Sequence, residues 1–260
     1  MIINEIPKTP RIDVLRQYES YDESKEEKDY FYITVLREQI PPIIEKYKYK
    51  TYMKGYSDNT DELAFRLLHF VSSNFHHKGD VILPAHRKVT DIISEARKTS
   101  GNTNCRGLSI ILSELLRANG IKARLVTCKP FEEPFEDCHV VVDCILPSGK
   151  RVMLDPTYNL FLRDENGELV SLEGLRQGII KGTKFVANED ASYNGGDFNL
   201  EDYLSYMAKN TVRFTSNVRL ADLTNEEEKD EVELVPANYP TKGFSEKKKF
   251  VYNDRRFWKI

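Results

Sequence analysis

Three residues in the middle of the chain, Cys105, His139 and Asp155, have the side chains that acyl transfer requires. In such a set a thiolate attacks a carbonyl carbon, an imidazole carries the proton, and a carboxylate holds the imidazole in the right tautomer. Backbone N–H groups at the start of a helix, that of Cys105 included, can face the oxyanion that develops. These residues are therefore the candidate nucleophile, base and orienting acid of a thiol-dependent enzyme.

A helix is predicted to carry Cys105 in its first turn. Apolar residues recur at helical spacing over residues 108–116, and Gly120 fits the position just after the helix end. Asn104 or Thr103 can serve as the N-cap, because short polar side chains accept hydrogen bonds from the free N–H groups there. The positive end of the helix dipole favours a thiolate. A lone cysteine at a helix start is more often a small buried hydrophobic residue, so the assignment depends on its partners.

The other two candidate residues lie on a predicted antiparallel hairpin. Its strands, His139–Leu146 and Arg151–Asp155, flank a turn that contains Gly149. If Val141 pairs with Asp155, the imidazole and the carboxylate lie diagonally on one face of the sheet, within reach of each other. This register needs a connection with an odd number of residues, such as a three-residue loop or a bulge at Gly149. An even connection would put the two side chains on opposite faces, because side chains alternate with a period of two.

Four separated pieces of the chain, in this order and at this spacing, resemble the transglutaminase-like cysteine protease superfamily. They are Cys105–Gly107, Leu115–Val126, His139–Val142 and Asp155–Thr157. The resemblance implies a papain-like α+β fold, in which the cysteine-bearing helix packs on an antiparallel sheet that carries the histidine and the aspartate. It also implies that Cys105 is the nucleophile, His139 the base and Asp155 the orienting acid.

Three positions depart from the pattern that many members of the superfamily share. Thr103 stands where they have glycine, Arg106 where they have an aromatic residue, and Val141 where they have tryptophan. The only tryptophan is Trp258, near the C-terminus, so another group must supply the second hydrogen-bond donor to the oxyanion. The candidates for this donor are Asn102, Asn104 or another upstream polar side chain. These departures point away from the protein cross-linking transglutaminases.

Two other acidic residues lie close to the candidate histidine in the sequence. Asp143 has the same strand parity as His139, but it lies four residues further along and is too far away to orient the imidazole. Asp137 lies in the loop just before the strand, and it stays an alternative orienting acid.

The remaining cysteines and a histidine pair raise the question of metal binding. Cys128, Cys138 and Cys144 do not have the spacing of a zinc knuckle, and we interpret them as core or surface thiols. His76 and His77 are adjacent, but no second pair of ligands stands at a spacing typical of zinc. We therefore predict neither a metal site nor a cofactor.

The composition excludes several classes of protein. The chain has 38 basic and 41 acidic residues and a net charge of −3, so no broad electrostatic field for nucleic acid is expected. The N-terminus lacks the basic start and apolar segment of a signal peptide, and no run approaches the roughly 20 apolar residues of a membrane span. Four cysteines are too few for a disulfide framework. We therefore expect a cytoplasmic protein that acts on a peptide or small amide substrate; its oligomeric state is left open.

With 260 residues, 40% of them hydrophobic, the chain suits one domain with additions. We predict an N-terminal arm and helix over residues 1–58, in which the arm is extended and the helix spans Asp22–Gln39. A transglutaminase-like catalytic core follows over residues 59–185. A β-rich extension over residues 186–260 is expected to add to the central sheet or to wall the cleft. Residues 188–197, rich in glycine and asparagine, are predicted to form a long loop with lid character.

The favoured function is hydrolysis of an amide or peptide bond through a Cys105 thioester, with water as the second acceptor. The same thioester passed to an amine would make the chain a transamidase or amide synthase, and the two hypotheses differ in which acceptor reaches the site. A third hypothesis is a non-catalytic binding member of the superfamily. Packing alone does not demand Cys105, His139 and Asp155 together, and this favours an enzyme.

Overall fold

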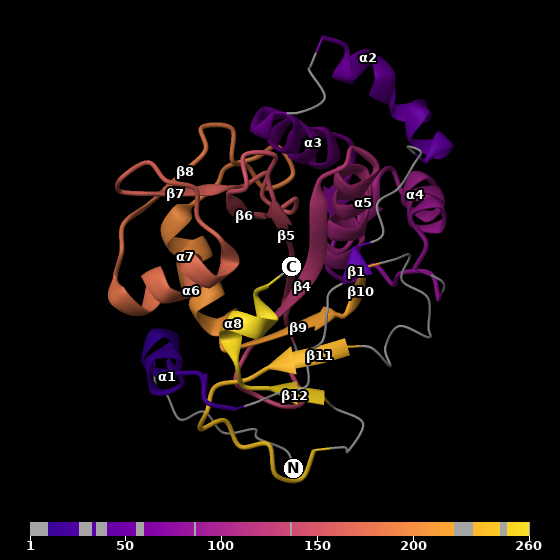
Figure 1. The fold of residues 1–260 in the computed structure, drawn as a ribbon. Coiled ribbons are helices and arrows are strands. Elements are labelled where there is room, and N and C mark those ends of the chain that lie inside the picture. Colours follow the sequence, from indigo (N-terminus) through magenta and orange to yellow (C-terminus); the bar gives the residue numbers. More distant parts are fainter. Residues whose placement is uncertain are drawn as a thin grey trace.

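A six-stranded, mostly antiparallel sheet forms the centre of the computed structural model (Figure 1). Its strands lie in the order β12-β11-β9-β4-β5-β6, and within it only β11 and β12 are parallel. They are β4 (Lys122–Lys129), β5 (His139–Ile145), β6 (Arg151–Leu154), β9 (Arg213–Asn217), β11 (Glu231–Leu234) and β12 (Lys249–Val251). The structure describes residues 10–25, 33–34, 41–55, 60–85, 87–135, 137–220, 231–244 and 249–259.

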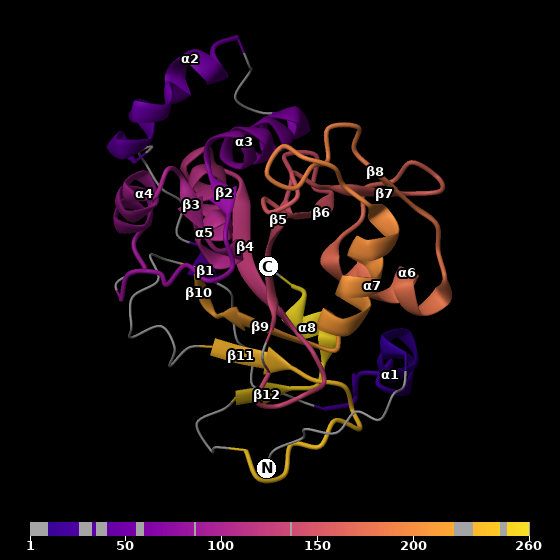
Figure 2. The ribbon, with the colours of Figure 1, turned by 180° about the vertical axis from the view of Figure 1, so that it is seen from behind.

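Helices cover both faces of this sheet, as the two opposite views show (Figures 1 and 2). One face carries α3 (Asp61–Asn74), α4 (Val89–Lys98) and α5 (Cys105–Ala118), and the other carries α1 (Arg11–Gln17), α6 (Leu172–Lys181) and α7 (Leu200–Asn210). Each face buries its own apolar cluster. Val142 and Cys144 of β5 belong to the cluster under α3, α4 and α5, whereas Val141 belongs to the cluster under α6 and α7. The predicted α+β fold is confirmed, with the cysteine-bearing helix packed on an antiparallel sheet.

Shorter elements complete the described chain. They are β1 (Ile33–Thr34), η1 (Pro42–Tyr47), α2 (Tyr49–Met53), β2 (His76–His77), β3 (Asn102–Thr103), β7 (Leu162–Asp164), β8 (Phe185–Ala187), β10 (Arg219–Leu220) and α8 (Asp254–Phe257). Small two-stranded ladders join segments that are distant in the sequence: β2 pairs with β3 and β1 with β10 in parallel, and β7 pairs with β8 antiparallel. The β2–β3 ladder brings the end of α3 beside the start of α5.

The hairpin of β5 and β6 has the register that the sequence predicts. Val142 pairs with Leu154, and the same ladder continued by one step sets Val141 opposite Asp155. The imidazole at the start of β5 and the carboxylate just after β6 therefore lie on the same side of the sheet.

The connection between these two strands has an odd number of residues. The N–H of Leu146 donates to the carbonyl of Lys150, which leaves the three residues Pro147–Gly149 in the loop. Gly149 has a φ of 84°, a left-handed conformation that glycine adopts without steric cost, and its N–H donates back to Leu146. Of the two odd-length connections that the sequence analysis left open, a three-residue loop or a bulge at Gly149, the structure has the three-residue loop.

The N-terminal segment differs from the extended arm that the sequence predicts. Residues Arg11–Gln17 form α1, whose Leu15 is fully buried against the α6 and α7 side of the molecule. Pro10 precedes this helix, at a position where its missing N–H removes no helical hydrogen bond. Most of the predicted helix Asp22–Gln39 lies outside the described residues. Two parts of it are described: residues 22–25 are not helical, and Ile33–Thr34 forms strand β1.

The C-terminal strands extend the central sheet beyond β4. Strand β9 pairs with β4, and β11 and β12 follow outward. Trp258 is buried with its ring centroid 5.0 Å from that of Phe214, so the end of the chain is packed under the sheet. In the part of the chain that the structure describes, no helix is both long enough and apolar enough to cross a membrane.

Candidate active site

Cys105 is the first residue of α5, and the local sequence explains why the helix starts there. The side chain of Asn104 caps the helix, because its Oδ1 accepts a 3.0 Å hydrogen bond from the N–H of Gly107. Strand β3 approaches the first turn closely: a Cβ added to Gly107 would lie 2.0 Å from Thr103 Oγ1. Glycine is therefore required at this contact, and the contact holds the sulfur at the tip of a buried helix.

The structure brings the three predicted residues together. His139 opens β5 and Asp155 follows β6, and both side chains are almost fully buried. Nε2 of His139 lies 2.6 Å from Oδ2 of Asp155. The same imidazole also faces the sulfur of Cys105, close enough to change its pKa. Since Nε2 faces the carboxylate, Nδ1 is the nitrogen left for the sulfur.

Two further groups fix the carboxylate that orients the imidazole. The N–H of Thr157 donates to Oδ1 of Asp155 over 3.0 Å, and the hydroxyl of Tyr203 donates to Oδ2 over 3.0 Å. Tyr203 lies on α7 and is buried. Because the carboxylate accepts from three directions, its orientation and that of the imidazole are both set before any substrate arrives.

The cysteine and the histidine form a charged pair. Burial raises the pKa of Cys105, but the hydrogen bonds from His139 and His77 and the positive charge of His139 outweigh it and lower the pKa to about 6. Burial lowers the pKa of His139, but the charge and hydrogen bond of Asp155 and the contact with Cys105 raise it to about 10. Between these two values the site holds a thiolate beside an imidazolium.

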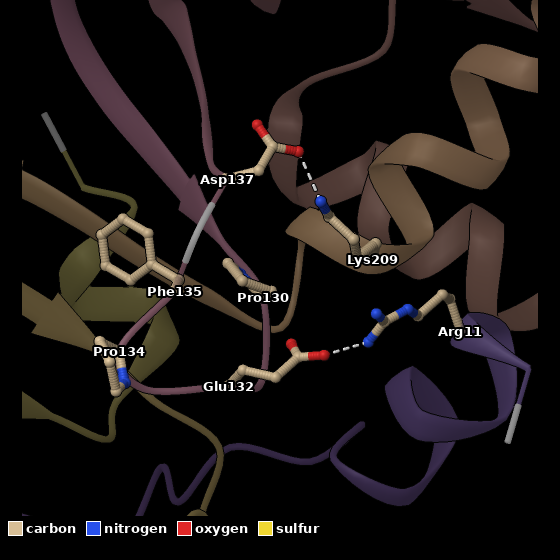
Figure 3. Close-up of a pocket in the computed structure, with 7 residues that line it drawn as sticks. All are labelled: Arg11, Pro130, Glu132, Pro134, Phe135, Asp137 and Lys209. Carbon is tan, nitrogen blue, oxygen red and sulfur yellow. Dashed lines mark hydrogen bonds and ion pairs between the residues drawn. The ribbon is translucent and has the colours of Figure 1, made fainter. Parts of the chain in front are cut away.

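The other two acidic residues considered as orienting acids have different partners. Asp137 pairs with Lys209 on α7 at the edge of a surface cavity (Figure 3). Asp143 is fully buried between Arg124, at 2.9 Å, and Arg151. Burial raises the pKa of Asp143, but these two guanidinium groups lower it below its usual value. Neither carboxylate contacts the candidate histidine.

The other three cysteines lack the surroundings that activate Cys105. Cys128 and Cys144 are fully buried in the two apolar clusters, Cys138 is half-buried, and none forms a disulfide. Burial raises the pKa of each of these thiols. At neutral pH they are therefore protonated, and Cys105 is distinguished from them by charge state.

A second histidine, which the sequence analysis assigned no role, also faces the sulfur. His77 lies on β2, where it pairs with Thr103 of β3, and its ring is close enough to Cys105 to lower the pKa of the thiol. Its Nδ1 lies 3.0 Å from the hydroxyl of Tyr193, and the Asn194 side chain bonds both its N–H and its C=O, at 2.7 and 3.0 Å. Nε2 is thus the nitrogen left for the sulfur. No sequence signal indicates this contact, because it depends on a two-residue parallel ladder and a loop 116 residues away.

The two asparagines proposed as oxyanion donors are already engaged. Nδ2 of Asn102 donates to the carbonyl of Thr99 over 2.6 Å, and Nδ2 of Asn104 donates to the carbonyl of Val81 over 2.9 Å. Each amide is therefore held by a backbone carbonyl at the approach to the helix. His77 is the upstream polar side chain that faces the sulfur.

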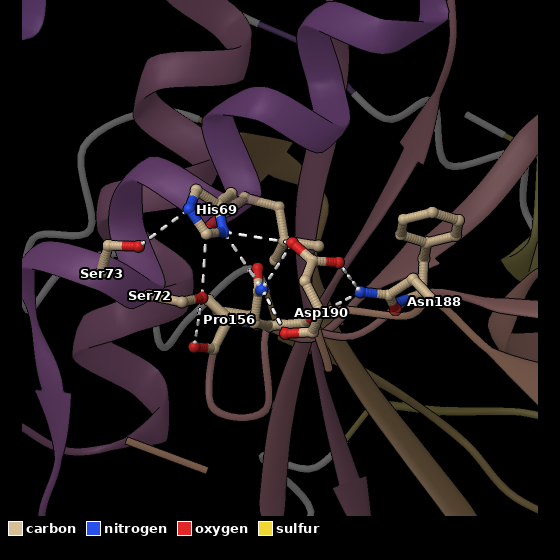
Figure 4. A network of polar contacts seen from close by, with 9 residues as sticks. His69, Ser72, Ser73, Pro156, Asn188 and Asp190 are labelled. Atoms are coloured by element: carbon tan, nitrogen blue, oxygen red, sulfur yellow. Dashed lines mark hydrogen bonds and ion pairs between the residues drawn. The ribbon is translucent and has the colours of Figure 1, made fainter. Parts of the chain in front are cut away.

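The loop over residues 188–197 is anchored at its base by a polar network (Figure 4). Asp190 lies 3.1 Å from Nδ1 of His69 on α3, and it also accepts from Nδ2 of Asn159 over 3.0 Å. Asn188 accepts from the N–H of Phe161 over 2.8 Å. Tyr193, further along the loop, bonds His77 of β2. The predicted loop is therefore attached both to α3 and to β2.

A comparison with protein families identifies part of the chain. Residues 47–156 match the model of the Transglutaminase-like superfamily. The resemblance that the sequence predicts is confirmed for this segment, which includes the cysteine helix, the histidine strand and the aspartate. A comparison with curated proteins gives no match.

Two of the solved structures that match come from bacteria. One is a putative cysteine protease from Cytophaga hutchinsonii, with 19% identity and a TM-score of 0.35, and the match covers 60% of this chain and 52% of that one. The other is a putative protease from Parabacteroides distasonis, with 15% identity and a TM-score of 0.31 over 63% of this chain and 29% of that one. The chain thus spans about half of the first protein and under a third of the second.

Proposed function

Because residues 47–156 match the transglutaminase-like superfamily, we propose that this protein is a thiol-dependent acyl-transfer enzyme that hydrolyses an amide or peptide bond. The observation that carries the proposal is the unbroken line of contacts from Cys105 through His139 to Asp155. A structural cysteine needs no charged partner, whereas a nucleophile needs a base within reach and a group that orients the base. Burial of a charged pair costs desolvation free energy, which a purely structural cysteine would not require.

In the proposed reaction the thiolate of Cys105 attacks the carbonyl carbon of the substrate and forms a C–S bond. As the tetrahedral intermediate collapses, the C–N bond breaks, and Nδ1 of His139 gives its proton to the leaving nitrogen. The neutral imidazole then takes a proton from water, which attacks the thioester. The C–S bond breaks, the carboxylic acid leaves, and the thiolate and imidazolium are restored. Asp155 stays ionised throughout and holds Nε2–H.

The oxyanion of the tetrahedral intermediate needs two donors. The first is the N–H of Cys105, which has no partner within the helix because the first N–H groups of a helix never have one. We assign the second to Nε2–H of His77. If the Tyr193 hydroxyl donates to Nδ1 of this ring, the neutral imidazole must carry its proton on Nε2, the nitrogen that faces the sulfur.

We expect His77→Ala to lower the turnover number by about 10²–10³-fold, the usual loss when one oxyanion donor is removed. His77→Gln, which can place an amide N–H near the same point, should recover part of this loss. The measurement is kcat across pH 6–9. If His77 only stabilised the thiolate, the rate of His77→Ala would return to the wild-type level at high pH; a loss that persists on the high-pH plateau supports the oxyanion role.

The charged pair also predicts the pH dependence of Cys105 reactivity. The pKa of about 6 means that the thiolate is lost only as the pH falls through 6, so alkylation by iodoacetamide should be nearly constant from pH 7 to 8. A thiol with the ordinary value of 9.0 would instead react about tenfold faster for each pH unit over that range. Mass spectrometry of the peptide that contains Cys105, compared with the one that contains Cys138, measures this. Equal rates at the two thiols would contradict the ion pair.

The function itself is tested by trapping the thioester. The protein is exposed to a library of peptide amides and activated esters, and intact-mass spectra are searched for the added acyl group. Support is an adduct on Cys105 that disappears with time as free acid is released. A product that carries an added amine in place of the acid would assign a transamidase instead, and failure of the whole library to acylate Cys105 would favour a binding protein.

A further inference from the structure

A cavity lined by aromatic rings adjoins the candidate active site. Its volume is about 660 Å³, large enough for one extended side chain. Its aromatic lining consists of Tyr158, Tyr193, Phe198, Tyr203 and Tyr206. These rings come from the segment after Asp155, from the loop over residues 188–197, from Phe198 just after that loop, and from α7. Two of the lining residues already have a part in the chemistry proposed above: Tyr203 bonds Asp155, and Tyr193 bonds His77. The other lining residues have none.

The walls of this cavity are shared with the catalytic residues. The ring of His139 lies edge-on to Tyr158 and Tyr206, with centroids 6.0 and 5.5 Å apart. The hydroxyl of Tyr203 reaches Asp155, and that of Tyr193 reaches His77. A substrate group in the cavity would therefore lie directly beside the bond that is broken.

Two exposed carboxylates, Asp197 and Asp202, also line the cavity, and no basic residue does. Within the described residues, neither side chain has a hydrogen-bond or ion-pair partner. The three catalytic side chains add to this charge, because the thiolate, the imidazolium and the carboxylate together have a net charge of −1. The cavity thus has an electrostatic field that attracts cations.

The neighbouring cavity, of about 440 Å³, shows the opposite arrangement (Figure 3). There Arg11 pairs with Glu132, and Lys209 pairs with Asp137, so each charge is matched within the lining itself. A ligand of either sign would have to break an existing ion pair to bind in that cavity. The tyrosine-lined cavity has two negative charges, and no basic side chain lines it.

We propose that the tyrosine-lined cavity is a subsite for a cationic side chain, lysine or arginine, next to the scissile bond of the acyl substrate. The electron-rich faces of aromatic rings attract ammonium and guanidinium groups, and carboxylates at the rim strengthen this attraction. The aliphatic stem of either side chain would pack on the rings while its charged end reaches Asp197 and Asp202. An uncharged apolar group would fill the same volume but leave both carboxylates unmatched. The inference rests on the proposed function, because it names the substrate of that site.

The first test compares peptide amides that differ only in the residue beside the scissile bond: arginine, lysine, norleucine, phenylalanine or glutamate. We expect kcat/KM to be about tenfold higher for arginine and lysine than for norleucine, which has a similar unbranched aliphatic chain without the charge. In the double variant Asp197→Asn/Asp202→Asn this ratio should fall to about 2 or less. Glu201→Gln is the matched control. Glu201 is an exposed acid in the same turn of α7 as Asp202, but it does not line the cavity. The control should keep the tenfold ratio.

A preference for norleucine or phenylalanine would overturn the proposal, and so would a cationic preference that survives in the double variant.

A second test does not need turnover. Three methanethiosulfonates that carry an aminoethyl, a methyl or a sulfonatoethyl group are compared for their rate of labelling Cys105. The ratio of the labelling rate of the cationic reagent to that of the neutral reagent should be several-fold higher in the wild type than in the double variant. If Cys105 never acylates but this difference holds, the subsite stands and the proposed hydrolysis fails. If peptides are cleaved without charge preference, the subsite fails alone.

Discussion

Replacement of Cys105 by alanine should abolish turnover, with a fall of at least about 10⁴-fold in kcat on any acyl donor that the wild-type protein uses. The reason is chemical: without the sulfur no C–S bond can form, and the imidazolium of His139 has no thiolate to pair with. The fold should survive, because the side chain that is removed lies at the tip of α5, outside both apolar clusters. We expect the free energy of unfolding to change by no more than about 1 kcal/mol. Turnover is measured with the donor found by thioester trapping, and stability by urea unfolding.

The matched control is Cys138→Ala, which removes a half-buried thiol from the segment just before His139. The pKa of Cys138 is raised by burial, so this thiol carries no charge at neutral pH, and its loss should leave turnover within about threefold of the wild type. Activity that persisted in Cys105→Ala and vanished in Cys138→Ala would show that the nucleophile has been assigned to the wrong cysteine. Activity that persisted in both would remove thiol chemistry from the function altogether.

The parts of the site that could be predicted are those that local sequence determines. The register of the hairpin follows from side-chain alternation and the length of its loop, and together these set His139 and Asp155 on one face. The position of Cys105 follows from the cap at Asn104 and the apolar period after it. Each of these features depends on residues less than about 20 positions apart, where spacing alone is informative.

The parts that could not be predicted depend on contacts between distant segments. His77 reaches the sulfur through a ladder of two residues, too short to leave a periodic pattern, and through Tyr193 in a loop without regular structure. Tyr203 is one apolar-facing residue among several on α7, and nothing in the helix pattern indicates that its hydroxyl meets Asp155. The helix at Arg11–Gln17 was missed because seven residues are too few for the helical period to stand out after two prolines, Pro7 and Pro10.

The position of the site follows from the two-sided packing of the sheet. Cys105 comes from the helix layer on one face, whereas Tyr203 comes from α7 on the other. The hairpin between these layers carries the imidazole and the carboxylate. A rigid sheet that is packed on both sides can hold side chains from two helices against one hairpin, which is what pre-organised acyl transfer requires. The geometry of the site is therefore a property of the whole fold, although each candidate residue is local in origin.

Asp155→Asn should lower kcat by about 10³–10⁴-fold without abolishing it. The amide oxygen can still accept from Thr157, but the amide N–H₂ would then face Nε2 of His139, and two donors cannot meet. The ring is expected to move its proton to Nδ1, the nitrogen that must accept a proton from the attacking water, so the imidazole becomes a poor base. The charge of Asp155 also raises the pKa of His139, so its removal lowers that pKa. With less imidazolium beside it, the pKa of Cys105 should rise above 6, and the alkylation profile should move to higher pH.

The control for this last prediction is Asp137→Asn, which tests the acid that the sequence left as an alternative. Asp137 bonds Lys209 and Tyr206 rather than the imidazole, so its amide should keep kcat within about threefold and leave the alkylation profile in place. Turnover and iodoacetamide rates of both variants across pH 5–9 decide between the two carboxylates. If Asp137→Asn caused the larger loss, or if Asp155→Asn kept its alkylation midpoint near 6, the orienting acid would not be Asp155. A lowered turnover together with an upward-shifted midpoint in Asp155→Asn alone is the result that only a carboxylate acting through His139 produces.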